Sequence, residues 1–337
     1  MLDARNPRSE IPATERSQGN YAVLIGDCVA SMRGLRAASV HTCVTSPPYF
    51  GLRDYKVEGQ IGLEETPEAF VARLVDVFRE VRRVLRDDGT LWLNLGDSYA
   101  QQGGRGEQGS TSARKGRANV SVQKKRASTR APDGLKPKDL IGIPWRVAFA
   151  LQADGWYLRQ DIIWSKPNPM PESVTDRCTK AHEYIFLFSK SPRYYFDNEA
   201  IKEPGVIPAG TKGAKGSAER FGTPGVNSRP PEYKVYDGMR NRRSVWTVTT
   251  KPYKGAHFAT FPPDLIEPCV LAGCPVGGTV LDPFGGSGTT AGVALRHGRN
   301  AIRCELNGDY ARDLIPSRVS SIAGRPVQSG GLSIYGF

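Results

Sequence analysis

The chain has 337 residues, 39% of them apolar, and a formal net charge of +12 at pH 7. Its length allows a sizeable core, arranged either as one large α/β domain with an inserted segment or as two domains. The positive charge favours a polyanionic partner, nucleic acid or an anionic membrane surface, and no apolar run approaches the roughly 18 residues that a membrane-spanning helix needs.

The N-terminal segment, residues 1–20, is polar and contains two prolines, so we expect a flexible arm. It lacks the apolar stretch of a secretory signal, which favours a cytoplasmic location. The six cysteines form no CxxC or Cys/His cluster of the kind that binds zinc. We therefore expect no metal, and reduced cysteines of which at least four are small core residues.

The first third of the chain alternates strands and helices. Its predicted elements are a strand at 21–25, a short helix at 29–35, a strand at 40–45, a helix at 66–85 and a strand at 90–95. Thr66 suits the N-cap of the long helix, and Pro67 suits its first position. The turn signal Asp87-Asp88-Gly89 leads into the strand that follows.

Two segments lack hydrophobic periodicity and are rich in basic residues. Residues 101–136 hold nine lysines and arginines against two acids, a net charge of +7. We expect a mobile basic loop over 101–138, which is either a solvated insertion or a loop that closes on phosphates. Residues 197–254 carry a net charge of +5 and five aromatic residues. This mixture suits a DNA-reading insert, although any long irregular insertion has a similar composition.

Regular elements resume on either side of the second basic segment. We predict a helix at 144–153, a strand at 157–165, a hairpin of strands 184–189 and 193–196, a helix at 263–272, a strand at 279–282, a helix at 289–296 and a strand at 301–305. Gly298 suits the left-handed position just past a helix end. This alternation of strands and helices predicts a mostly parallel sheet covered on both faces.

Two short motifs each follow a predicted strand. Ser46-Pro47-Pro48-Tyr49 comes early, and Asp282-Pro283-Phe284-Gly285-Gly286-Ser287-Gly288-Thr289 comes late. Because ligands bind at the carboxyl ends of parallel strands, we expect both motifs at the mouth of the sheet. Glycines that admit a ligand, followed by the N–H groups of a helix start, suit a nucleoside-containing cofactor. The G-x-x-x-x-G-K-[ST] pattern of ATP sites is missing, whereas a dinucleotide stays conceivable.

Together the motifs resemble the catalytic and S-adenosylmethionine motifs of the N4-cytosine and N6-adenine DNA amino-methyltransferases, in the permuted order with the catalytic motif first. The resemblance covers roughly residues 21–100, 138–196 and 257–315. It implies a Rossmann-like, mostly parallel methyltransferase sheet with helices on both faces and an irregular DNA-recognition insert. The regions would be an arm (1–20), a catalytic part (21–196), a target-recognition insert (197–256), a cofactor-binding part of the same domain (257–320) and a C-terminal tail (321–337).

The resemblance implies S-adenosylmethionine as the cofactor. Asp282 would bind its ammonium group, directly or through water, and Glu305 would accept hydrogen bonds from the ribose hydroxyls. The other candidate cofactor-binding residues are Asp27, Phe258, Pro262, Phe284, Gly285, Gly286, Ser287, Gly288 and Thr289. A surface carboxylate at Glu305 and a packing role for Phe258 and Pro262 are the alternatives.

The candidate catalytic residues are Ser46, Pro47, Pro48 and Tyr49. The Ser46 hydroxyl and the Pro47 carbonyl would accept the two protons of an exocyclic amine and draw its nitrogen out of conjugation. Tyr49 would offer a face on which an extruded base stacks. Because the sulfonium is already a strong leaving group, alignment would supply most of the catalysis.

In that family, serine at the first motif position favours methylation of cytosine N4, and aspartate favours methylation of adenine N6. Asparagine occurs in enzymes that act on protein or RNA. We therefore expect a DNA (cytosine-N4) methyltransferase acting on double-stranded DNA, with a restriction endonuclease as a possible partner. The candidate DNA contacts are Lys166, Asn168, Arg240, Arg242 and Arg243. Adenine N6 methylation and a catalytically silent DNA-binding protein on the same scaffold stay open.

Overall fold

The structure, a computed structural model, describes residues 20–52, 54, 57–100, 134–211, 235–250, 261–308, 311, 315–324 and 332–336. Its strands are β1 (Tyr21–Ile25), β2 (Val40–Thr45), β3 (Leu85–Leu95), β4 (Tyr157–Ser165), β5 (His182–Ser189), β6 (Glu203–Pro204), β7 (Met239–Arg240), β8 (Val245–Thr247), β9 (Thr279–Asp282), β10 (Asn300–Glu305) and β11 (Leu332–Gly336). Its helices are α1 (Cys28–Arg33), α2 (Pro67–Val84), α3 (Ile143–Ala153), the 3-10 turn η1 (Glu199–Ile201), α4 (Pro263–Gly273), α5 (Thr289–Arg296) and α6 (Ile315–Ala323).

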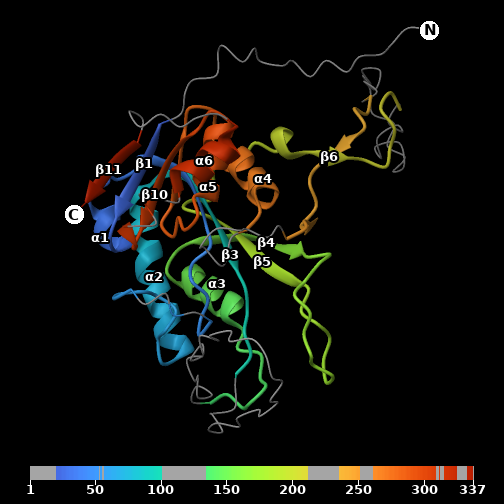
Figure 1. Cartoon of the computed structure of the whole chain (residues 1–337). Coiled ribbons are helices and arrows are strands. Elements are labelled where there is room, and N and C mark those ends of the chain that lie inside the picture. The colour runs from blue at the N-terminus through green and yellow to red at the C-terminus, as the bar shows by residue number, and fades with distance from the viewer. Residues whose placement is uncertain are drawn as a thin grey trace, which may run out of the picture.

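Nine strands form one sheet in the order β11-β1-β10-β9-β2-β3-β5-β4-β8. The six strands from β11 to β3 are parallel, β5 is antiparallel to both its neighbours, and β8 is parallel to β4. The mostly parallel sheet is therefore confirmed. Chain segments separated by most of the sequence thus lie side by side, with β1 between β10 and β11 (Figure 1).

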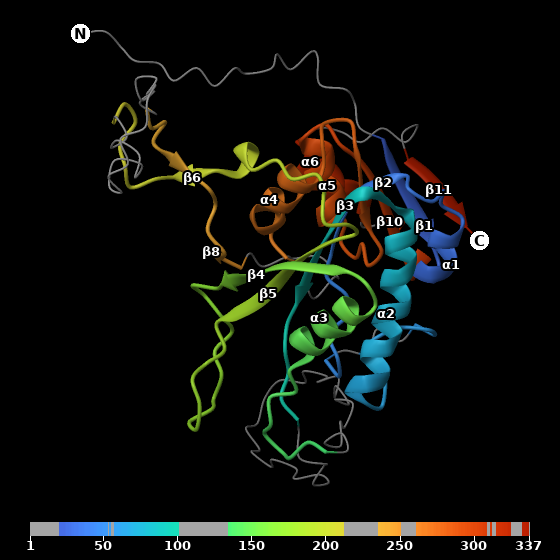
Figure 2. The ribbon, with the colours of Figure 1, turned by 180° about the vertical axis from the view of Figure 1, so that it is seen from behind.

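Helices cover both faces of the sheet, as predicted. Figures 1 and 2 show α1, α2 and α3 on one face and α4, α5 and α6 on the other. Each face has its own buried apolar cluster, with Phe70 and Phe78 of α2 in one and Leu265 of α4 and Val293 of α5 in the other. Burial of these two clusters against a common sheet fixes the helices relative to the strand ends.

The predicted helix cap, the predicted position of Gly298 and the predicted burial of the cysteines are confirmed. The Thr66 side chain accepts a hydrogen bond from the Ala69 N–H at 3.1 Å and so caps α2, whose first residue is Pro67. Gly298 has a φ of 70°, the left-handed value expected just past α5. Five of the six cysteines are buried, in line with their predicted place in the core.

The predicted hairpin of 184–189 and 193–196 is wrong in its second strand. Both edges of β5 are already paired, with β3 on one side and β4 on the other, so 193–196 has no strand edge to join. This segment instead follows the start of β3, where the Tyr195 N–H donates to the Asp88 carbonyl at 2.9 Å. The Ser191 hydroxyl holds the same segment by donating to the Asp87 carbonyl at 2.7 Å.

Two further boundaries differ from the sequence analysis. The turn expected at Asp87-Asp88-Gly89 is a bulge inside β3, which already begins at Leu85, because Val40 and Thr42 of β2 pair with Leu85 and Thr90. The expected C-terminal tail contains β11, which joins the sheet beside β1. The N-terminal arm up to residue 19 and the basic loop over 101–133 lie outside the described residues. None of the described helices is long and apolar enough to cross a membrane.

Candidate active site

The proline motif and the glycine motif leave adjacent strands at the same edge of the sheet. β2 and β9 are parallel neighbours in which Thr42 pairs with Val280 and Cys43 with Leu281. At their ends, the Thr45 hydroxyl donates a hydrogen bond to Asp282 Oδ1 at 2.6 Å. Both motifs therefore lie at the carboxyl ends of neighbouring parallel strands, as the sequence predicts.

Asp282 is the buried link between these motifs. It is 4% exposed, and besides the bond from Thr45 its carboxylate accepts one from the Thr290 hydroxyl at 2.7 Å and one from the Phe284 N–H at 3.1 Å. Burial raises the pKa of Asp282, and the three donors oppose that rise. The carboxylate thus joins the end of β2, the glycine loop and α5, and its contact with a cofactor ammonium stays a prediction.

The glycine loop has the backbone geometry that the motif requires. Gly286 and Gly288 have φ values of 44° and 79°, in the left-handed region that favours glycine. A Cβ on Gly285 would lie 2.8 Å from the Cβ of Arg303 on β10, so the loop packs directly on that strand. α5 begins at Thr289, which brings the unpaired N–H groups of its first turn to this edge.

Two carboxylates end the strands beyond the loop. Glu305 ends β10, where it accepts a hydrogen bond from the Asn307 N–H at 3.0 Å and pairs with Arg303 at 3.2 Å. Burial raises the pKa of Glu305, and Arg303 lowers it to a lesser extent. Asp27 follows β1, caps α1 by accepting from the Ala30 N–H at 2.9 Å and lies 3.5 Å from Arg73.

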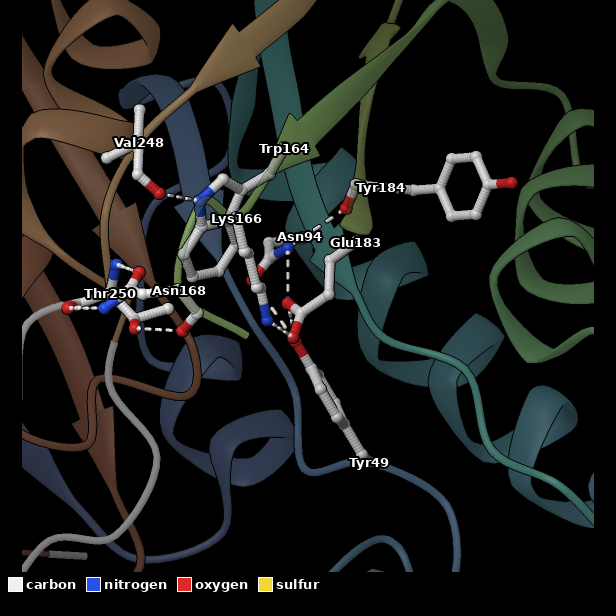
Figure 3. A network of polar contacts seen from close by, with 9 residues as sticks. All are labelled: Tyr49, Asn94, Trp164, Lys166, Asn168, Glu183, Tyr184, Val248 and Thr250. Atoms are coloured by element: carbon white, nitrogen blue, oxygen red, sulfur yellow. Dashed lines mark hydrogen bonds and ion pairs between the residues drawn. The ribbon is translucent and has the colours of Figure 1, made fainter. Parts of the chain in front are cut away.

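Tyr49 lies inside a network of polar contacts at this edge. Its hydroxyl donates to Glu183 Oε2 at 2.6 Å and lies 3.3 Å from Asn94 Oδ1 (Figure 3). Burial and the Glu183 carboxylate raise the pKa of Tyr49 well above its usual value, with a hydrogen bond from Ser46 acting in the opposite direction. The phenol therefore stays protonated near neutral pH. Its ring packs so closely on Gly96 that an added Cβ there would overlap it.

The same carboxylate holds a lysine. Lys166, one residue past β4, forms an ion pair with Glu183 Oε1, and its Nζ lies 4.2 Å from the centre of the Trp164 ring. Asn94 Nδ2 donates to Glu183 Oε2 at 3.2 Å. Figure 3 shows the Tyr49, Asn94 and Lys166 side chains converging on Glu183.

A family model described as "DNA methylase" matches residues 40–315, which include both motifs and most of the sheet. The chain belongs to the DNA methylase family. S-adenosylmethionine is the cofactor of this family of N6-adenine and N4-cytosine methyltransferases, so the resemblance drawn from the motifs is confirmed.

Relatives and solved structures agree with this placement. The methylase is 50% identical to the type II methyltransferase M.SmaI of Serratia marcescens over 289 residues, 86% of this chain and 87% of the relative. It is also 50% identical to M.Cfr9I of Citrobacter freundii, over 85% of this chain and 83% of the relative. The fold matches TTHA0409 of Thermus thermophilus, complexed with S-adenosyl-L-methionine, at a TM-score of 0.58, 24% identity and coverage of 94% and 98%. It matches the cytosine-N4-specific PvuII DNA methyltransferase at 0.58, 18% identity and coverage of 94% and 95%.

The residues at the strand ends fit S-adenosylmethionine. The loop before α5 offers N–H groups for a carboxylate, and its glycines take backbone angles that other residues rarely adopt. Glu305, with its side chain 11% exposed, ends the strand next to the loop, and its contact with ribose hydroxyls stays a prediction. Pro262 is buried directly before α4, and Phe258 lies outside the described residues.

The candidate DNA contacts make local bonds in the structure. Asn168 is exposed, and its amide pairs with the backbone of Thr250, donating at 3.1 Å and accepting at 2.9 Å. Arg240 and Arg243 both donate to Glu203 Oε1, at 2.9 and 2.5 Å. The Arg242 guanidinium lies 4.7 Å from the centre of the Trp246 ring. The arginine contacts thus lie within the insert, whereas the Asn168–Thr250 pair ties the insert to the segment after β4.

The sequence analysis did not single out several residues that shape the site. They are Thr45, Asn94, Glu183, Thr290 and Arg303. Thr45 and Thr290 lie beside predicted motif residues, so their positions carried a local signal. Asn94, Glu183 and Arg303 come from strands whose sequences are typical of the core, and no spacing relates them to the motifs.

Proposed function

We propose that this methylase transfers the methyl group of S-adenosylmethionine to the exocyclic N4 amine of a cytosine in double-stranded DNA. The observation that carries this proposal is the neutral Ser46 at the first position of the proline motif, one residue after the bond between Thr45 and Asp282. The cofactor supplies an electrophilic methyl group on a sulfonium. The protein then needs to hold an amine nitrogen in line with that methyl group.

Ser46 and the Pro47 carbonyl are suited to that alignment. Ser46 is partly exposed and Pro47 is buried, so packing fixes the proline next to a serine that solvent can reach in part. As acceptors of the two amine protons, they would favour a tetrahedral nitrogen whose lone pair is no longer delocalised into the base ring. A neutral serine is sufficient for the polarised amine of cytosine, whereas a carboxylate is usual in the adenine enzymes of the family.

The cofactor contacts in this proposal divide between two strand ends. The N–H groups after Gly285, Gly286 and Gly288 would bind the methionine carboxylate, and Glu305 would accept the ribose hydroxyls. The Asp282 carboxylate already accepts three hydrogen bonds, so it would bind the cofactor ammonium only with its remaining lone pairs. Its main contribution would then be to hold the two loops together.

Methylation of a paired base requires that the base leave the duplex and enter the site. Lys166 and Asn168, just past the end of β4, and Arg240, Arg242 and Arg243 of the insert are the proposed contacts with the strand. The names of the relatives, which are type II methyltransferases, support a restriction endonuclease that cleaves the same sequence as the functional partner.

The direct test is the chemical identity of the product. DNA from a host without amino-methylation is incubated with the enzyme and labelled S-adenosylmethionine, digested to nucleosides and analysed by mass. We expect N4-methylcytosine, and N6-methyladenine alone would replace the cytosine proposal with the adenine alternative. Ser46→Ala should lose transfer, whereas Ser191→Ala, beyond the opposite end of β5, serves as the control. Intact cofactor binding without any methylated product would favour a silent DNA-binding protein.

A further inference from the structure

Glu183 is a charged side chain in a part of the molecule that packing alone would fill with apolar groups. It is the second residue of β5, and Ile185 and Leu187, which alternate with it along the strand, belong to a buried apolar cluster. Its side chain is only 15% exposed. A buried ion pair contributes little to stability compared with apolar residues of similar volume, so stability does not explain a carboxylate here.

The antiparallel direction of β5 brings this carboxylate to the catalytic edge. β2, β3 and β4 end at that edge, whereas β5 begins there. Tyr49 follows β2, Asn94 is near the end of β3, and Lys166 follows β4. Glu183 is therefore the one described carboxylate that receives donors from all three of these strand ends.

The contacts divide its two oxygens between two functional groups. Oε2 accepts from the Tyr49 hydroxyl at 2.6 Å and from the Asn94 amide at 3.2 Å, and Oε1 pairs with the Lys166 ammonium. The Tyr49 ring also packs against Gly96, which leaves that ring little freedom to move. The same ammonium lies over the Trp164 ring, whose N–H donates to the Val248 carbonyl at 2.8 Å.

We infer that Glu183 is a positioning residue for the extruded base: it fixes the Tyr49 ring on which the base stacks and aims the Lys166 ammonium at the base edge. This inference rests on the proposed function, because it assigns Tyr49 and Lys166 to the target-base site. Glu183 itself touches neither base nor cofactor. Loss of the carboxylate would release the ring and the ammonium together while leaving the cofactor loop on β9 unchanged.

The test compares Glu183→Ala and Glu183→Gln with Asp161→Ala, which removes an exposed acid from β4. We expect kcat for methyl transfer to fall by about 10²-fold in Glu183→Ala, the effect of a small misplacement of a reacting group. Glu183→Gln, which still accepts from Tyr49, should recover part of that loss. The affinity for S-adenosylmethionine, measured by calorimetry, should equal that of the wild type in all three variants.

A double-mutant cycle separates positioning from a merely structural role. If Glu183 acts through Tyr49, then Tyr49→Phe combined with Glu183→Gln should lose less activity than the two single losses added together. Additive losses, an unchanged kcat in Glu183→Ala, or a loss of cofactor affinity equal to the loss of kcat would overturn the inference.

A measurement without turnover distinguishes this inference from the proposed function. In protein labelled at the tyrosine ring carbons, the Tyr49 signal is identified by its absence in Tyr49→Phe. Its pKa, raised in the wild type, should move toward the usual tyrosine value in Glu183→Gln. An unchanged titration would sink the inference even if the enzyme is active. Absence of any methylated amine with the wild type would instead sink the proposed function, whatever the titration shows.

Discussion

Thr45 and Asp282, 237 positions apart in the chain, are joined by a buried 2.6 Å hydrogen bond at the ends of β2 and β9. Thr45 immediately precedes the proline motif, and Asp282 opens the glycine motif. The bond therefore sets the distance between the place where an amine would be held and the place where the methyl donor would bind. In this chain the proline motif and the glycine motif are thus far apart in the sequence and adjacent in the fold.

Replacing Thr45 by valine tests that link. Valine has nearly the same shape but no hydroxyl, so the buried Asp282 carboxylate would keep only two of its three donors. We expect a loss of about 1–3 kcal/mol in the free energy of unfolding, measured by urea denaturation. Thr247→Val, at an exposed position of β8, should change it by less than about 0.5 kcal/mol. Equal stability of the two variants would mean that the bond does not hold the loops.

The glycine loop can be tested with a pair of matched substitutions. Gly288 and Gly277 have φ values of 79° and 78°, so alanine introduces the same backbone strain at both positions, about 1–3 kcal/mol. Gly277 lies in open space before β9, at the opposite end of that strand. We expect both variants to melt earlier and only Gly288→Ala to lose affinity for S-adenosylmethionine in calorimetry. Equal affinities would remove Gly288 from the cofactor site.

Periodicity and caps predicted most of the fold because those signals are local. The strands 21–25, 40–45, 157–165 and 279–282 and the helix 289–296 have the bounds that the sequence indicated. The second strand of the hairpin failed for a non-local reason: whether 193–196 pairs depends on which strands already flank β5, and no feature of that segment records it. The place of β11 beside β1 is likewise set by tertiary contacts.

The site residues likewise fall into those with a local sequence signal and those that only tertiary contacts bring into the site. Proline and glycine motifs are recognisable because their residue types are demanded by backbone geometry. Glu183 and Asn94 were not predicted, because no feature of either strand's sequence marks them as site residues and they meet only when β3 and β5 lie side by side. Arg303 was missed for the same reason, since its bond to the Gly286 carbonyl exists only once the loop has folded onto β10.

Cofactor affinity should depend on pH through Glu305. Burial raises the pKa of this carboxyl, so it takes up a proton at a higher pH than an ordinary glutamate does. The protonated form accepts ribose hydroxyls poorly, and we expect the affinity for S-adenosylmethionine to fall as the pH is lowered toward that raised pKa. Glu305→Gln should bind weakly with no such dependence in titration calorimetry, and Glu68→Gln, an exposed change on α2, should follow the wild type. A Glu305→Gln profile parallel to that of the wild type would contradict the ribose assignment.

Gly96→Ala should separate methyl transfer from cofactor binding. The added Cβ would overlap the Tyr49 ring, which must then leave its place against β3 and its bond to Glu183. The glycine loop follows β9, on the other side of β2, and the three atoms nearest to the added Cβ all belong to Tyr49. We expect kcat to fall by about 10²-fold with the affinity for S-adenosylmethionine preserved. The double variant Tyr49→Ala and Gly96→Ala should have the same kcat as Tyr49→Ala alone, because the added Cβ then meets no ring. A further loss in the double variant would show that Gly96 matters for a reason other than Tyr49.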